Sequence, residues 1–187
     1  PTIGTETTIN AFKTIFFASI LIVIFIAYSF RKVPRPASSW RFGVCAIIAL
    51  VHDVLVVVGI FSLLGHFAHI EIDSLFVTAI LTVIGFSVHD TIVVFDRIRE
   101  NLRRQIGVSF GQVVNDSILQ TLVRSLNTLL TSILVLFTLL IFGGESVKWF
   151  IVALLIGILS GTYSSIFNAA PMLVAWDEII RKRIKRP

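Results

Sequence analysis

Apolar residues occupy five long blocks along the chain, and short polar joints separate one block from the next. The blocks cover residues 11–30, 42–64, 74–95, 117–142 and 147–176. Because an α-helix rises ~1.5 Å per residue, each block is long enough to cross the roughly 30 Å hydrocarbon core of a lipid bilayer. The pattern therefore predicts an all-α membrane protein, a bundle of five transmembrane helices.

Composition supports the membrane class over a soluble one. Of the 187 residues, 56% are hydrophobic and only 14% are charged, whereas a soluble domain carries roughly 25% charged residues. The single cysteine, Cys45, excludes an intrachain disulfide and a thiolate metal cluster. Since the chain opens on Pro1 rather than on Met, we expect it to be the C-terminal portion of a longer protein.

The polar joints alternate in charge along the chain. The joints after the first, third and fifth blocks are rich in Arg and Lys, whereas residues 65–73 and 143–146 carry no Lys or Arg. The positive-inside rule places basic joints in the cytoplasm. We therefore expect an outside N-terminus, a cytoplasmic C-terminus and a plasma-membrane location. The same asymmetry accounts for the net charge of +5 without a nucleic-acid partner.

One joint, residues 97–115, has a helical pattern of its own. Ile98, Leu102 and Ile106 recur every four residues, and charged residues lie between them. This spacing is typical of an amphipathic helix on the cytoplasmic membrane surface. A cytoplasmic extension of the third block, packed on its neighbours, fits the same pattern.

Ionisable residues interrupt three of the apolar blocks. A charge at the centre of a spanning helix costs roughly 2.5–3.5 kcal/mol, so such residues persist where they are paired, hydrated or functional. Asp90 in the third block and Arg124 in the fourth lie about 8–10 Å from the cytoplasmic edge at ~1.5 Å per residue. Adjacent antiparallel helices would bring these two side chains face to face. His52 and Asp53 lie about a turn further out in the second block.

The combination of acid and guanidinium has a chemical interpretation. A carboxyl group in a low dielectric favours its neutral form, while a nearby Arg favours the charged form. Moving Asp90 toward or away from Arg124 would switch the carboxyl between releasing and taking a proton. We interpret Asp90, Arg124, His89, Asp53 and His52 as a candidate proton relay. A static buried ion pair that fixes helix packing is the alternative.

Polar and small side chains mark two further helix faces. Gln120, Asn127 and Thr131 follow one face of the fourth block and predict a polar seam in the bundle. Gly157 and Gly161 belong to a small-residue stripe in the fifth block, which lets transmembrane helices approach closely. We expect these glycines to serve helix packing.

The segment Gly85–Asn101, with the sequence GFSVHDTIVVFDRIREN, closely resembles the signature of the SecF family. This family supplies the smaller subunit of the SecD–SecF protein-export complex and belongs to the resistance–nodulation–division superfamily. The opening Pro1–Gly4, the His52–Asp53 pair and the segment Gln120–Ser125 resemble the same family in the same order. The resemblance covers essentially the whole chain.

The resemblance carries several implications. Family members have six spans, with a large extracytoplasmic domain after the first, so this chain would lack the first span and that domain. They work with SecD and the SecY-E-G channel, using the proton-motive force to help move preproteins across the membrane. Asp90 and Arg124 match the family's intramembrane proton pathway, and Asp96 and Arg97 match a structural cytoplasmic motif. His89 stands where the family usually has Asn, which either adds a titratable group or replaces a hydrogen bond.

Two other functions fit parts of the sequence. The chain could be half of a proton-driven small-solute efflux transporter of the same superfamily, and its extracytoplasmic domain would discriminate between the two. An intramembrane hydrolase would use His52, Asp53, His89 and Asp90 as zinc ligands. The sequence has no His-Glu-x-x-His motif and no activated Ser or Cys dyad. We therefore expect no catalytic residue, no bound metal and no cofactor.

Overall fold

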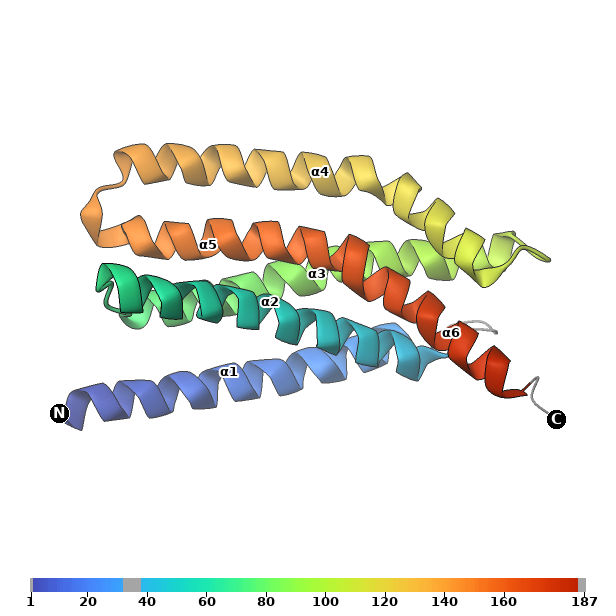
Figure 1. The fold of residues 1–187 in the computed structure, drawn as a ribbon, viewed down its shortest axis with the longest axis horizontal. Helices are drawn as coiled ribbons and strands as arrows, with labels where there is room; N and C mark the ends of the chain where they lie inside the picture. The colour runs from blue at the N-terminus through green and yellow to red at the C-terminus, as the bar shows by residue number, and fades with distance from the viewer. Residues whose placement is uncertain (1, 32–37, 185–187) are drawn as a thin grey trace.

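In the computed structural model, the described residues 2–31 and 38–184 form five long helical rods packed side by side (Figure 1). The first four rods are single helices. The fifth consists of a helix, a π-helical turn and a second helix that continue one another. The elements are α1 (Thr2–Ser29), α2 (Ser39–Ala68), α3 (Ser74–Arg104), α4 (Phe110–Phe142), α5 (Glu145–Ser164), η1 (Ser165–Ala169) and α6 (Ala170–Ile184).

The predicted all-α membrane fold is confirmed. Four stretches within the described residues are long and apolar enough to cross a bilayer: Ser39–Ala68, Ser74–Arg104, Phe110–Phe142 and Glu145–Lys182. The first rod contributes a shorter apolar helix, Lys13–Ser29. The direction in which the bundle crosses the membrane stays a prediction from the charged joints.

The joint at residues 97–115 does not form a separate surface helix. α3 continues without a break through Arg104, and α4 begins at Phe110 after a short turn. Ile98 is completely buried, and Leu102 packs partly buried against the core. Ile98 and Leu102 therefore lie against neighbouring helices, as in the extension that the sequence also allowed, whereas Ile106 is 91% exposed in the turn after α3.

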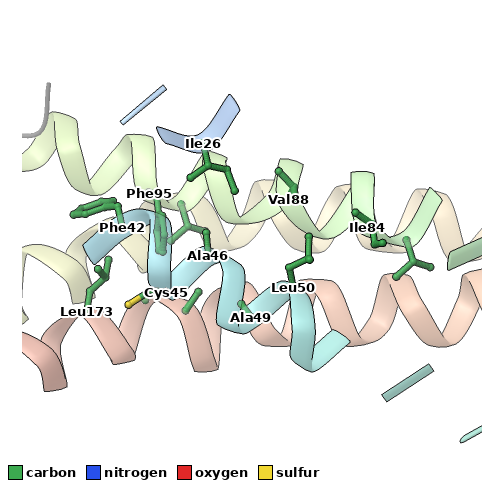
Figure 2. Close-up of a cluster of buried hydrophobic side chains, with 14 of the residues drawn as sticks. Ile26, Phe42, Cys45, Ala46, Ala49, Leu50, Ile84, Val88, Phe95 and Leu173 are labelled. Carbon is green, nitrogen blue, oxygen red and sulfur yellow. The ribbon is translucent and has the colours of Figure 1, made fainter. Parts of the chain in front are cut away.

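α3 is the central element of the bundle. It contacts α1, α2, α4, α5 and η1, whereas α1 contacts only α2 and α3 among the principal helix pairs. An aromatic cluster joins three rods near one end of the bundle, because Phe42 of α2 packs against Phe95 of α3 and Phe30 lies against both rings (Figure 2). Residues on α3 are thus positioned from several sides.

α3 and α5 approach each other most closely at two glycines. A Cβ atom added at Gly157 would lie 2.0 Å from Val83 Cγ2, and one added at Gly161 would lie 3.2 Å from Ser87 Cα. The absence of side chains at these positions lets the two backbones meet. This approach lets serines of α3 and α5 reach the same carboxyl group of α2, that of Asp53.

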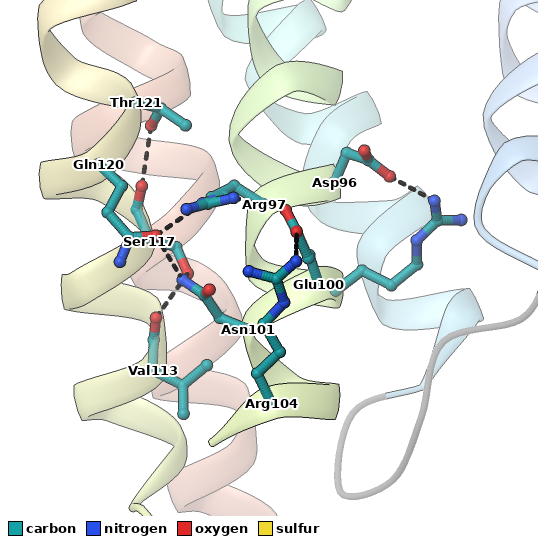
Figure 3. A network of polar contacts seen from close by, with 10 residues as sticks. Asp96, Arg97, Glu100, Asn101, Arg104, Val113, Ser117, Gln120 and Thr121 are labelled. Carbon is teal, nitrogen blue, oxygen red and sulfur yellow. Dashed lines mark hydrogen bonds and ion pairs between the residues drawn. The ribbon is translucent and has the colours of Figure 1, made fainter.

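A polar network holds the ends of α3 and α4 together (Figure 3). Asn101 is buried and donates Nδ2–H bonds to Ser117 Oγ and Gln120 Oε1, both at 2.9 Å. Arg97 donates from Nε to the same Gln120 oxygen at 2.6 Å. The network fixes the register of α4 against α3 at the turn that joins them.

We expect Asn101→Ala to destabilise the α3–α4 pair. The substitution removes both Nδ2–H bonds of Asn101, although the Ser117 hydroxyl still donates to the Val113 carbonyl oxygen. Each lost hydrogen bond costs about 0.5–1.5 kcal/mol. The free energy of unfolding, measured by thermal denaturation in detergent, reports this loss. Arg104→Ala is the control, because exposed ion pairs such as Arg104 with Glu100 contribute ~1 kcal/mol or less. Equal losses in the two variants would contradict the role of the network.

Candidate functional site

Asp53 lies in the middle of α2 and is only 1% exposed. Its Oδ1 lies 3.0 Å from His52 Nδ1 and accepts a hydrogen bond from Ser160 at 2.9 Å. Its Oδ2 accepts bonds from Ser87 at 2.5 Å and Ser164 at 2.7 Å. Three helices therefore supply hydrogen-bond partners to one buried carboxylate, and its capacity of roughly four bonds is filled.

Asp90 lies on α3 and is also buried, with 6% of its surface exposed. Its Oδ1 accepts a hydrogen bond from Ser125 of α4 at 2.8 Å, and its Oδ2 accepts one from Ser165 of η1 at 2.9 Å. Two of its roughly four acceptor positions are thus filled. Asp90 therefore has fewer hydrogen-bond donors than Asp53.

The expected contact between Asp90 and Arg124 is not formed. Across residues 2–31 and 38–184, no ion pair joins these side chains, and Arg124 is exposed on α4. The next residue, Ser125, is the one that reaches Asp90. Successive residues of an α-helix, with 3.6 residues per turn, point about 100° apart. The predicted depth is therefore compatible with pairing, but the helix face is wrong by one residue.

The polar seam also lies elsewhere than predicted. The buried face of α4 carries Ser117, Thr121 and Ser125, and α4 has no buried residue beyond Ser125. Asn127 and Thr131 are exposed, and the Thr131 hydroxyl bonds back to the Asn127 carbonyl at 2.9 Å. Asn127 and Thr131 therefore lie on the exposed face of α4, although Leu136 further along the helix still packs partly buried against the core.

The other predicted site residues differ in burial and in the contacts that they make. His52 is half-buried beside Asp53, whereas His89 is exposed on α3, next to Asp90 in the chain. Gln120 takes part in the α3–α4 network described above.

No group of three His, Cys, Asp or Glu side chains in the described ranges is arranged to hold a metal ion. The zinc-hydrolase alternative therefore has no assembled ligand set in this part of the chain.

Serine hydroxyls are the functional groups that the sequence reasoning missed. The sequence pattern did not connect any serine to the two acids. Ser87 precedes Asp90 by three residues and so lies on the same side of α3. Ser125 immediately follows Arg124, and the contact with Asp90 was predicted for the charged residue instead of the serine. Serines at these offsets from a buried acid were the available signal.

The site as a whole consists of two buried carboxylates, each held by hydroxyl groups from neighbouring helices. His52 is the only basic side chain in the described residues within ion-pair distance of either carboxylate, and it contacts Asp53 alone. Hydroxyls can donate to a charged carboxylate and accept from a protonated one. The arrangement can therefore accommodate Asp90 in either protonation state.

Comparison with known proteins gives a consistent result. The family model "Protein export membrane protein SecD/SecF, C-terminal" matches residues 1–179. Protein translocase subunit SecF of Thermobaculum terrenum is 60% identical over 177 residues, which cover 95% of this chain and 55% of that protein. The SecF subunit of Anaerolinea thermophila is 47% identical over 178 residues, covering 95% and 57%. The chain thus spans about half the length of these curated relatives.

A solved structure has the same arrangement of helices. The crystal structure of SecDF from Thermus thermophilus, described as a translocon-associated membrane protein, matches with a TM-score of 0.85 and 39% sequence identity. The match covers 95% of this chain and 23% of that one. Protein translocase subunit SecDF of Bacillus subtilis is 40% identical over 179 residues, covering 94% of this chain and 23% of that protein.

Proposed function

The chain belongs to the SecD/SecF family of protein-export membrane proteins, and from this premise we propose that it couples the proton-motive force to protein export through the Sec channel. It is a multi-pass membrane protein related to protein translocase subunits. The proposed role is non-enzymatic, since it consists of proton binding and release coupled to helix movement. The relatives named above are translocase subunits and give no support to small-solute efflux.

The observation that carries the proposal is the environment of Asp90. Its carboxyl group is buried within the bundle, and its hydrogen-bond partners among residues 2–31 and 38–184 are the hydroxyls of Ser125 and Ser165. Desolvation favours the neutral acid, whereas an approaching cation favours the charged form. A buried carboxyl without a basic partner is thus suited to bind a proton and to lose it when a positive charge arrives.

The positive charge that would approach Asp90 is the guanidinium group of Arg124. Arg124 immediately follows Val123 and precedes Ser125, so a rotation of α4 by about 100° would exchange the serine for the guanidinium at Asp90. Of the candidate spans, α4 has the least buried apolar window, with 6% of it buried within the bundle. We infer that rotation of α4 accompanies proton release from Asp90.

The exposed face of α4 supports SecD as the partner. An exposed Arg124 with Asn127 and Thr131 nearby would be costly against lipid. This face of α4 therefore requires contacts with polar groups inside the membrane. In the SecDF proteins of Bacillus subtilis and Thermus thermophilus, the part similar to this chain belongs to a single longer chain. We propose that SecD covers this face, that the SecY-E-G channel and the translocating preprotein are further partners, and that lipid surrounds the rest.

The test is a pair of substitutions at Arg124 in the complex with SecD. We expect Arg124→Ala to abolish the stimulation of preprotein translocation by a proton gradient, because Asp90 then has no cation to displace its proton. The fold should persist, since the bonds of Asp90 come from serines. Arg124→Lys keeps the charge without the planar donor group and should give intermediate stimulation. Translocation into membrane vesicles, with and without a proton gradient, measures the effect.

Arg97→Ala serves as the matched control. It removes a guanidinium that lies on α3 at the end of the bundle and bonds to Glu100 and Gln120 rather than to either buried acid. Translocation by this variant should still respond to the gradient. A normal response in Arg124→Ala would exclude Arg124 from the coupling.

A further inference from the structure

Ser164 and Ser165 are successive residues at the junction of α5 and η1, and each hydrogen bonds to a different buried carboxylate. Ser164 Oγ donates to Asp53 Oδ2 at 2.7 Å, and Ser165 Oγ donates to Asp90 Oδ2 at 2.9 Å. Both serines are completely buried. One point on a single helix therefore contacts the acidic groups of both α2 and α3.

Each of these serines has a second acceptor within its own helix. Ser164 Oγ lies 3.2 Å from the Gly161 carbonyl oxygen, and Ser165 Oγ lies 3.0 Å from the Thr162 carbonyl oxygen. A hydroxyl group carries only one proton to donate. Either the carboxylate or the backbone carbonyl can receive that proton in a full hydrogen bond.

The charge on Asp90 decides which acceptor Ser165 uses. An ionised carboxylate is the stronger acceptor, because charge-assisted hydrogen bonds are stronger than neutral ones. When Asp90 is protonated, its own O–H can donate to Ser165 Oγ, and the serine then donates to the Thr162 carbonyl. The proton that Asp90 gained stays on Asp90, and only the direction of the hydrogen bonds changes.

The helix is weak at the place where this change occurs. Ser165 is the first residue of the π-helical turn, and Pro171 follows shortly after it in α6. Proline lacks an N–H group, and in a regular α-helix its ring would clash with the carbonyl of Phe167, four residues earlier. π-turns are frequent at functional sites, and serines that bond to the preceding turn often bend helices.

We propose that Ser165 is a positioning residue that transmits the protonation of Asp90 to the π-turn η1. This inference rests on the proposed proton-binding role of Asp90 and adds the element that responds to it. α6 would carry the response from η1 to the start of α2, because Asp177 of α6 pairs with Arg41 of α2 at 3.5 Å. Bending at η1 would shift α6 against the start of α2.

Among the described residues, few other titratable groups lie near Asp53 and Asp90. His52 contacts Asp53 from α2. His89 on α3, Arg124 on α4 and Tyr163 on α5 are exposed, and within the described part of the chain none of them hydrogen bonds or pairs with either carboxylate. A pH-dependent change in η1 is therefore assigned to Asp90 through Ser165, or to Asp53 with His52 through Ser164, and substitutions separate the two.

The test is hydrogen–deuterium exchange of the backbone amides of Ser165–Ala169, in the complex with SecD in lipid nanodiscs. Exchange is compared at two pH values and normalised to α5 residues of the same sample. We expect protection of η1 to fall about fivefold at the lower pH, the factor that corresponds to one ordinary hydrogen bond. Ser165→Ala should remove this pH dependence. Ser19→Ala should retain it, because the Ser19 hydroxyl bonds only to the Ile15 carbonyl.

Two results would overturn the inference. One is wild-type protection of η1 that does not change with pH while translocation still responds to a proton gradient. The other is a Ser165→Ala protein that keeps the wild-type pH dependence, even where Ser164→Ala loses it. Absence of any gradient response in the wild-type complex would instead reject the proposed function. The two failures are therefore distinguishable.

Discussion

Replacing Asp90 by Asn is expected to abolish the stimulation of translocation by a proton gradient while leaving the protein inserted and folded. The amide keeps the shape of the carboxyl group. Its oxygen can accept a bond from one of the two serines, Ser125 or Ser165, and its NH2 group can donate to the hydroxyl oxygen of the other. An amide does not bind and release a proton as a carboxyl group does, so the proton-dependent exchange of Ser125 for Arg124 is lost. Preprotein translocation into vesicles, with and without a proton gradient, measures the loss.

A matched control for this variant is Glu71→Gln. Glu71 lies exposed in the joint between α2 and α3, outside both helices, so its neutralisation removes one negative charge without touching a buried acid. The control should respond to the gradient like the wild type. Gradient-dependent stimulation that persists in Asp90→Asn would eliminate Asp90 as the coupling group.

Gly157→Ala is expected to cause a large loss of stability. The added Cβ atom would lie 2.0 Å from Val83 Cγ2 and 2.6 Å from Val83 Cγ1, so α5 must move away from α3. Overpacking of this severity costs about 3 kcal/mol. Because Asp53 and Asp90 bind hydroxyls of α5 and η1, the same movement should also impair coupling. Thermal unfolding in detergent measures the stability.

The control for this substitution is Gly59→Ala. Gly59 lies within α2, and a Cβ atom there meets nothing within 4 Å, so the melting temperature should stay unchanged or rise slightly through better helix propensity. The double variant Gly157→Ala/Val83→Ala should recover part of the stability, because it removes the two nearest methyl groups. A Gly157→Ala protein as stable as Gly59→Ala would contradict the close approach of α3 and α5.

The helical fold was predictable from the sequence because hydropathy follows the membrane, but the helix ends were not. The apolar third block stops at Phe95, where charged residues begin, yet α3 continues to Arg104. Glu100 pairs with Arg97 and Arg104 along the helix, and Ile98 is buried, so the charged segment stays helical. Hydropathy alone reports where lipid ends and does not report where a helix ends.

The candidate acids were predictable, but their partners were not. A buried Asp in an apolar block is conspicuous because of its cost, whereas a serine in such a block is unremarkable. The pairing of Asp90 with Arg124 was inferred from equal depth, which sequence spacing gives. The rotation of α4 about its own axis depends on packing with α3 and α5, and a step of one residue replaces Arg124 with Ser125.

The π-turn η1 was likewise beyond the reach of the sequence pattern. Pro171 lies in an apolar block that is otherwise continuous, and proline in a helix is compatible with a kink, a break or a widened turn. Packing decides among these outcomes. In this bundle, Ser165 and Ala169 are completely buried, so the chain keeps its helical course through a wider turn.

The most direct test of the account is infrared difference spectroscopy of the carboxyl groups in the membrane-embedded complex during a pH titration. We predict a protonated-carboxyl band that appears as the pH falls, is present in the wild type and in Glu71→Gln, and is absent in Asp90→Asn. A band that is unchanged in Asp90→Asn, or a wild-type protein without any such band, would contradict the central claim that Asp90 binds the coupling proton.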